Sequence, residues 1–176
     1  MKIEQFWEII DETRKNAVDL EDHMDFLIEE LLKKSVKEII SYQGHFEAQM
    51  ERLSNVPLWL AGLYIMNIQD ETEMEEQFPY LCAWIITQGK EAVDAVIENA
   101  DNIAPYLTKD KSTSQWNCEC EMMLYVADNA YEMKTGKEDF YELFDSEPFF
   151  EIKGEFPEST PDYILMFPKI SLKLNS

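Results

Sequence analysis

The chain is poor in basic residues and in glycine, and both shortages exclude classes of function. Its 176 residues contain 15 Lys and Arg against 36 Asp and Glu, which gives a formal net charge of −21. Nucleic acids and anionic membrane surfaces attract basic patches, so we expect a protein that binds neither. The five glycines are scattered, and neither a Gly-x-Gly-x-x-Gly loop nor a Walker lysine motif occurs. A nucleotide-dependent enzyme of a common class is therefore not expected.

Histidine is also scarce, and the positions of the two histidines exclude one metal site common in helical proteins. A ferritin-like di-iron bundle needs a Glu three residues before each liganding His. Leu20 precedes His23 at this spacing, and Tyr42 precedes His45. His45 lies beside an apolar helical stripe, so we expect a boundary residue with a local hydrogen bond; the alternative is a histidine that titrates near neutral pH.

Cysteine is present three times, as Cys82, Cys118 and Cys120, which is not the even set of a secreted disulfide framework. This usage favours a reducing cytoplasm, and the N-terminus has no apolar signal-peptide core. We predict a long helix over residues 115–135, on which the thiols of Cys118 and Cys120 would point about 200° apart. We therefore expect one buried and one partly exposed thiol, and neither a metal site nor a cofactor.

The distribution of apolar residues predicts a folded and mainly helical protein. Hydrophobic residues make up 45% of the chain, which is ordinary for a globular domain. Long stretches lack turn signals, and Phe6, Trp7 and Ile10 follow the spacing of one helical face. We predict a single, mainly α-helical domain over residues 1–176, with irregularly packed helices and a short extended or β C-terminal portion. The longest apolar stretch, Val56–Met66, is far shorter than the ~20 residues that a membrane helix needs.

Capping signals predict several helix boundaries. Ser35 with Glu38, and Thr72 with Glu75, have the spacing of a capping box, in which each side chain bonds the backbone N–H of the other residue. Pro79 is expected to break or kink the helix that follows Thr72.

The chain after Pro148 has a less regular pattern. Residues 149–152 and 164–167 fit two short strands, and a final helix that begins at Pro161 fits equally well. Of the four tryptophans, Trp116 lies among polar residues, so we expect it to reach the surface or a pocket. The others, Trp7, Trp59 and Trp84, lie on apolar faces and are expected in the core.

The densest charge lies in residues 70–76, which we call the acidic run. Its acids are Asp70, Glu71, Glu73, Glu75 and Glu76. Acids in the first turn of a helix interact favourably with the positive end of the helix dipole, but three would suffice for that. An ordinary solvated helix start is the first interpretation of this run, and a docking patch for a basic partner is the alternative that the excess of acids suggests. Weak calcium binding has less support, because the Asp-x-Asp-x-Asp-Gly spacing of an EF-hand is absent.

Several blocks of the sequence resemble a bacterial family of uncharacterised domains, domain of unknown function 4240. They are Phe-Trp-Glu-Ile-Ile-Asp at 6–11, Leu-Trp-Leu-Ala at 58–61, Ala-Trp-Ile-Ile-Thr-Gln-Gly-Lys at 83–90, the stretches 98–107 and 131–136, and Phe-Pro-Lys-Ile at 167–170. The chain departs from the family pattern at Cys82, where the family usually has Arg, so an activity that depended on this arginine is not expected. The resemblance implies a helical bacterial domain and no established reaction.

Together these features favour a non-catalytic interaction protein of the bacterial cytoplasm that binds a basic partner. One concrete form is an immunity or antitoxin-like protein that covers the basic active site of a nuclease-type toxin. The expected contact residues are the five acids of the acidic run, with Trp116. The alternative is a small-ligand binder or an enzyme whose pocket forms from His45, Trp116 and nearby carboxylates. A third hypothesis is a scaffold or a subunit of an oligomer.

Overall fold

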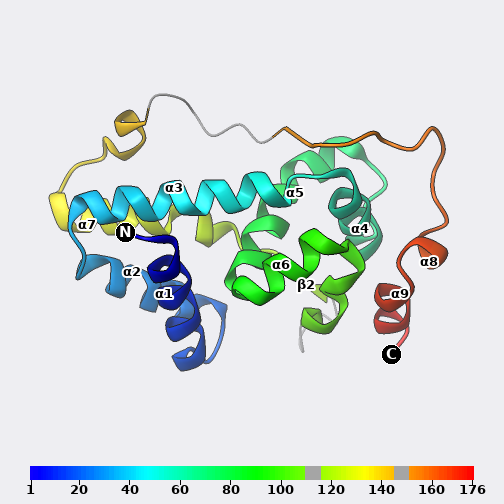
Figure 1. Ribbon diagram of the computed structural model, residues 1–176, viewed down its shortest axis with the longest axis horizontal. Helices are drawn as coiled ribbons and strands as arrows, with labels where there is room; N and C mark the ends of the chain where they lie inside the picture. The colour runs from blue at the N-terminus through cyan, green and yellow to red at the C-terminus, as the bar shows by residue number, and fades with distance from the viewer. Residues whose placement is uncertain (110–115, 145–150) are drawn as a thin grey trace.

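The computed structural model describes residues 1–109, 116–144 and 151–176 and shows a mainly helical protein (Figure 1). The α-helices are α1 (Ile3–Asn16), α2 (Leu20–Leu32), α3 (Val36–Leu53), α4 (Val56–Met66), α5 (Glu71–Thr87), α6 (Lys90–Glu98), α7 (Val126–Thr135), α8 (Tyr163–Met166) and α9 (Pro168–Leu174). The 3-10 helices are η1 (Ala100–Tyr106), η2 (Glu121–Tyr125) and η3 (Phe140–Leu143), and the strands are β1 (Thr108–Lys109) and β2 (Trp116–Asn117). The predicted mainly α fold is confirmed.

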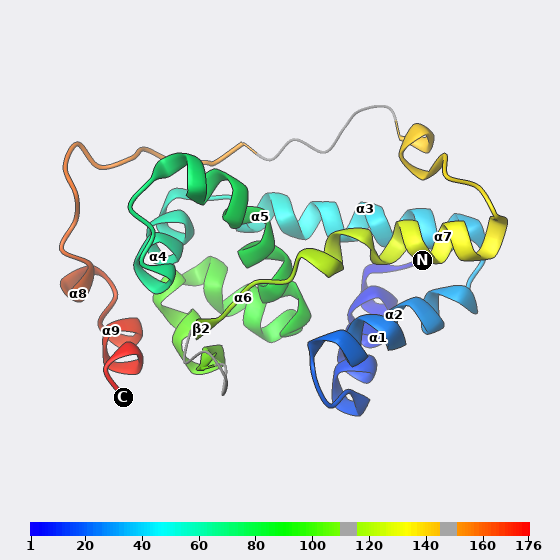
Figure 2. The same cartoon turned by 180° about the vertical axis from the view of Figure 1, so that it is seen from behind.

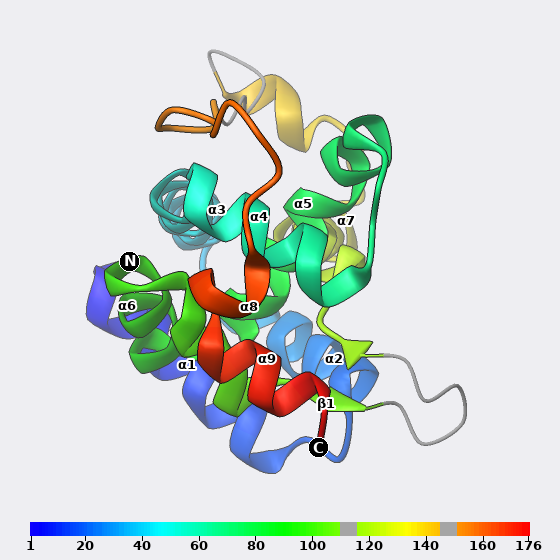
Figure 3. The same ribbon diagram turned by 90° about the vertical axis from the view of Figure 1, so that its right-hand side faces the viewer.

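The helices are arranged around α3, which runs along most of the molecule (Figure 1). Helices α1, α2 and α7 gather at one half of α3, and α4, α5 and α6 gather at the other half (Figure 2). The last part of the chain passes over α4 and ends in α8 and α9, where α9 packs against η1 (Figure 3). None of the helices within the described stretches has the length and apolar character of a membrane span.

One continuous cluster of buried apolar side chains joins these helices. The three tryptophans predicted for the core, Trp7, Trp59 and Trp84, are buried in it. Helices α4 and α5 approach each other closely at Gly62, where an added Cβ would lie 2.4 Å from the side chain of Met74. Glycine therefore permits this contact between α4 and α5.

Helix α3 begins as its sequence predicts, whereas α5 does not. The Glu38 N–H donates to the Ser35 hydroxyl at 3.3 Å, and the Ser35 N–H donates to the Glu38 carboxylate at 2.9 Å. The capping box predicted at Thr72 is wrong, because Asp70 is the N-cap residue of α5 and accepts a bond from the Thr72 N–H at 2.7 Å. A carboxylate makes a stronger bond to the free N–H groups of a helix start than a hydroxyl does.

Helix α5 continues through Pro79, so the proline does not end it. A proline has no N–H, which leaves the carbonyl of Glu75, four residues earlier, without its helical partner. Glu75 is exposed, so water can satisfy this carbonyl. The helix ends shortly before Gly89, whose φ of +94° is a conformation that favours glycine.

The predicted long helix over residues 115–135 is wrong in its first half. Trp116 and Asn117 form β2, which pairs antiparallel with β1, and α7 begins only at Val126. Between them the Cys120 N–H donates to the carbonyl of Tyr80 in α5 at 3.0 Å. In an extended segment, residues two apart point to the same side, and both Cys118 and Cys120 are buried. The expected partly exposed thiol is therefore also wrong.

The C-terminal segment is extended up to α8, and the strand alternative for residues 164–167 is wrong because these residues lie in and directly after α8. Residues 149 and 150 lie outside the described part of the chain. The extended portion is attached to the start of α4, where the Val56 N–H donates to the Lys153 carbonyl at 2.9 Å and the Lys153 N–H donates to the Ser54 carbonyl at 3.0 Å.

Asp101 fixes the far end of this segment. Its carboxylate is 2% exposed and accepts bonds from the Lys169 N–H at 3.0 Å and the Ile170 N–H at 2.9 Å. It therefore caps α9 from η1. Tyr64 of α4 adds a second polar contact, since its hydroxyl lies 2.9 Å from the Ser171 hydroxyl. These bonds hold α9 against η1 and α4.

We expect Asp101→Ala to lower the free energy of unfolding by about 2–4 kcal/mol, because the first turn of α9 loses a charged acceptor in a buried position. The matched control is Asp162→Ala, which removes an exposed cap from α8 and is expected to cost about 1 kcal/mol or less. Urea unfolding of both variants and the parent protein measures the difference. Equal losses in the two variants would contradict the role given to Asp101.

Candidate functional site

The acidic run lies at the exposed start of α5. Asp70 is exposed, and its carboxylate caps α5. Glu71, Glu73, Glu75 and Glu76 are exposed, and none of the salt bridges found among the described residues involves them. Their charges gain some stabilisation from the helix dipole, and their carboxylates remain accessible to a partner.

The geometry of the helix divides these four glutamates between two sides of α5. Successive residues of an α-helix are rotated by about 100°, so Glu71 and Glu75 project about 40° apart on one side. Glu73 and Glu76 project on another side, together with Tyr80, within about 60° of one another. The acidic run is therefore two separate pairs of acids, and a flat partner surface would meet one pair at a time.

The side of Glu71 borders a groove of mixed polar and aromatic lining, which we call the Trp59 groove. It has a volume of about 220 Å³, and its lining includes Trp59, Leu63, Phe156 and Tyr163, with Glu71 at its edge. The Trp59 and Phe156 rings meet edge to face with centroids 6.0 Å apart. Helix α4 therefore supplies one wall of the groove, and the C-terminal segment supplies the other.

The side of Glu73 and Glu76 continues into a surface that we call the tyrosine face. It consists of Tyr80 from α5, Met122 and Tyr125 from η2, and Tyr141 from η3. The exposed fractions of Met122, Tyr125 and Tyr141 are 45%, 44% and 43%. The backbone bond from Cys120 to Tyr80 places η2 beside α5, on the side seen in Figure 2.

Carboxylates surround the tyrosine face. The pKa of the Tyr80 hydroxyl is raised, first by the charge of Glu121, then by partial burial and by Tyr125 and Glu76. The pKa of Tyr141 is raised to about 12, first by partial burial and then by Asp128, Tyr125 and Glu47. Both phenols are therefore neutral at physiological pH, and the local potential is negative.

Trp116 does not lie with the acidic run. Lys109 places its Nζ 4.8 Å from the centroid of the Trp116 ring, across the β1–β2 pair. The neighbouring Asn117 lines a groove with Thr87, at the C-terminal end of α5. Since α5 rises about 1.5 Å per residue, Trp116 lies near the opposite end of this helix from Glu71. The structure brings the acids to one end of α5 and this tryptophan to the other.

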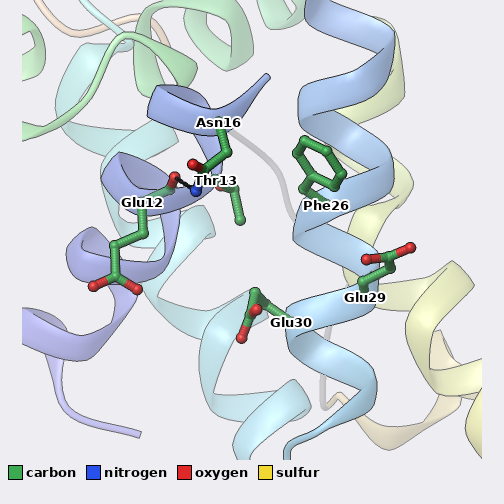
Figure 4. Close-up of a pocket in the computed structure, with 6 residues that line it drawn as sticks. All are labelled: Glu12, Thr13, Asn16, Phe26, Glu29 and Glu30. Atoms are coloured by element: carbon green, nitrogen blue, oxygen red, sulfur yellow. Dashed lines mark hydrogen bonds between the residues drawn. The ribbon is translucent and has the colours of Figure 1, made fainter. Parts of the chain in front are cut away.

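An acidic groove lies between α1 and α2 (Figure 4). Its volume is about 280 Å³, and Glu12, Glu29, Glu30 and Phe26 are among its lining residues. In Figure 4, Glu12 and Glu30 extend toward the same end of the groove, whereas Glu29 points away from α1. Glu30 is paired with Lys33 at 2.5 Å. The sequence gives no local signal for this groove, because its acids come from two helices.

A polar clamp joins α1 to the turn between α5 and α6. Arg14 donates from Nη1 to the Gln88 carbonyl, and its Nη2 lies 3.4 Å from the Asp11 carboxylate. Gly89 is required next to this clamp, since an added Cβ would lie 2.4 Å from an Asp11 oxygen. Arg14, which is partly buried, therefore has a structural role in packing.

Residues 1–133 match the family model described as protein of unknown function DUF4240. This match covers about three quarters of the 176 residues. The chain belongs to the DUF4240 family. No curated protein and no solved structure matches it significantly.

Sequence blocks that resemble the family contribute residues to contacts between helices in this DUF4240 protein. Asp101, from the block 98–107, caps the helix formed by the block 167–170. Gly89, from the block 83–90, makes room for the clamp of Arg14. Cys82, where the family usually has Arg, is 1% exposed, and burial raises the pKa of its thiol. An arginine at this position would point into the core and would need a buried partner.

The thiols of Cys118 and Cys120 in this DUF4240 protein are buried. Burial raises the pKa of Cys118 to about 12 and that of Cys120 to about 11, so both remain protonated thiols at neutral pH. His45 is half-buried, as expected of a boundary residue, but its hydrogen bond is not local: Nε2 lies 3.1 Å from the carbonyl of Met1, just before α1. Trp116 lies toward the other end of α1, so the pocket of His45 and Trp116 considered from the sequence does not form.

His23 is the one buried histidine. Its Nε2 lies 3.1 Å from the Thr13 hydroxyl, which in turn donates to the Ile9 carbonyl at 2.7 Å. Burial lowers the pKa of His23 to about 4, and the nearby Arg14 adds to this effect. The imidazole is therefore neutral at pH 7, and its protonation in the folded protein is unfavourable.

This shift predicts a pH dependence of stability. Because the pKa of His23 is lower in the folded state than the ordinary value of 6.5, its contribution is present above pH 6.5 and is lost as the pH falls toward 4. The expected loss between pH 7 and pH 5 is about 2 kcal/mol.

The measurement is urea unfolding at both pH values for the parent protein, His23→Gln and His45→Gln. The difference between pH 7 and pH 5 should shrink in His23→Gln and stay at the parent level in His45→Gln. An unchanged difference in His23→Gln would contradict the assignment.

Proposed function

We propose that this DUF4240 protein is a non-catalytic interaction protein that binds a basic protein at the acidic start of α5. The observation that supports this most strongly is the set of four exposed glutamates in the acidic run without a salt bridge among the described residues. The net charge of −21 adds a long-range attraction for cationic proteins, which speeds their encounter.

The concrete form of this proposal is an immunity or antitoxin-like protein in the bacterial cytoplasm. A nuclease needs a basic surface to bind its phosphate backbone. An exposed cluster of carboxylates is complementary to such a surface and would cover it. In this role the protein needs no reactive side chain of its own, which agrees with thiols that remain protonated and a buried neutral His23.

A small-ligand binder or enzyme is the alternative, and the Trp59 groove is the observation that favours it. The groove combines aromatic walls with the polar edge of Glu71, which is the usual character of a small-molecule site. A melting temperature raised by a small molecule, and by no basic protein or peptide, would favour this alternative.

The test compares two triple variants with the same change in charge. Glu73, Glu75 and Glu76 are replaced by Lys in one, and Glu4, Glu8 and Glu21 in the other; these control residues are also exposed acids in or near first helical turns. Each variant changes the net charge from −21 to −15. The probe is an eight-residue arginine peptide, with affinity measured by titration calorimetry at several salt concentrations.

We expect the α5 variant to bind the peptide at least about tenfold more weakly than the parent, a loss of about 1.4 kcal/mol, and to show a smaller salt dependence. The control variant should lose much less. Equal losses in the two variants would mean that only the overall charge matters, and they would contradict a docking site at α5.

A further inference from the structure

We infer that the tyrosine face, with Glu73 and Glu76 at its edge, is where the partner docks, and that it selects arginine side chains over lysine. This inference rests on the proposed function and specifies the chemistry of the partner. The two sides of α5 differ in their exposed rings and carboxylates. These differences favour the side of Tyr80, rather than the side of the Trp59 groove, as the docking site.

The tyrosine face combines large exposed rings with carboxylates. Tyr125 and Tyr141 are each more than two fifths exposed, and so is Met122 of η2. Aromatic residues and methionine are enriched in protein interfaces, where rigid rings contribute contact area at little entropic cost. Such rings grouped on a free surface indicate a binding site.

The charges around these rings specify a cationic partner. Within the described residues, the charged groups that raise the pKa of Tyr80 and Tyr141 are carboxylates from α3, α5, η2 and α7: Glu47, Glu76, Glu121 and Asp128. Lys134 of α7 is directed elsewhere, because its Nζ donates to the Leu32 carbonyl at the end of α2 at 2.9 Å. A neutral or acidic segment would therefore be repelled or left without partners here.

Arginine fits this chemistry better than lysine. A guanidinium group is planar, stacks on an aromatic ring and offers paired N–H donors to a carboxylate. A lysine ammonium is more strongly hydrated and has no flat face to stack. The exposed rings of η2 and η3, together with carboxylates such as Glu121 and Asp128 that act on the neighbouring tyrosines, offer both kinds of contact to arginine side chains.

The opposite side of α5 offers less to a cation. The Trp59 groove has Glu71 as its one acid, and the C-terminal segment already occupies part of its wall with Phe156 and Tyr163. The Trp59 groove therefore offers a cation fewer carboxylates than the tyrosine face does.

The experiment uses eight-residue arginine and lysine peptides of equal charge, titrated into the full-length protein. The parent should bind the arginine peptide about fivefold more tightly than the lysine peptide, as expected for two exposed cation–π contacts. Tyr125→Ala with Tyr141→Ala should abolish this preference and leave the lysine affinity nearly unchanged. Tyr125→Phe with Tyr141→Phe keeps both rings and should retain the preference. Urea unfolding confirms that each variant is folded.

A second comparison tests the choice of side. Glu73→Lys with Glu76→Lys should weaken arginine binding several-fold more than Glu71→Lys with Glu75→Lys, although both pairs change the charge of the same helix equally. A parent without preference for arginine, or a preference that survives in the alanine variant, would overturn the inference. The proposed function fails separately, if the triple variant at α5 binds no more weakly than its control.

Discussion

An excess of carboxylates that the chain itself cannot neutralise is the constraint on which this structure depends. If each of the 15 basic residues paired with a different one of the 36 acids, 21 acids would still have no cation. Unpaired carboxylates are costly to bury, so the fold must keep them in water or give them backbone N–H groups. At the surface, the carboxylates of Asp19, Asp70 and Asp162 accept bonds from backbone N–H groups as helix caps. In the interior, the carboxylate of Asp101 does the same.

A few polar contacts, one of them made by a buried carboxylate, set the positions of the helices. The apolar core supplies most of the stabilisation, and specific polar contacts then set the positions of the elements. Asp101 holds α9 to η1, and Arg14 holds α1 to the turn at Gly89. Both contacts involve blocks that resemble the DUF4240 family, so these blocks have packing roles in this chain. Within the described part of the chain, the glutamates of the acidic run form no salt bridge, and Asp70 caps α5.

Much of the fold follows from local sequence, and the errors have identifiable causes. Amphipathic spacing and the box at Ser35 predict α1 and α3 correctly, because the interactions that form them are local. The box at Thr72 is wrong because Asp70 is a stronger competitor for the same N–H groups. The helix predicted over 115–135 is wrong because a backbone bond to Tyr80 and the burial of both cysteines require an extended segment. Neither contact has a signal in the local sequence.

The candidate site also has one part that the sequence predicts and one part that it does not. The acidic run is visible in the sequence, since its members are consecutive. The tyrosine face is not, because it depends on the packing of η2 against α5 and of η3 against α7. Trp116 belongs to the two-residue sheet at the other end of α5.

The account depends on carboxylates that repel one another in the free protein and are therefore ready to attract a cation. The most direct measurement is the free energy of unfolding by urea, an uncharged denaturant, as sodium chloride is raised from about 0.01 M to about 0.15 M. This change shortens the Debye length from about 30 Å to about 8 Å. The account predicts that stability rises with salt, because screening relieves the repulsion. Stability that falls with salt would show that the acids are already compensated within the chain, and it would contradict the account.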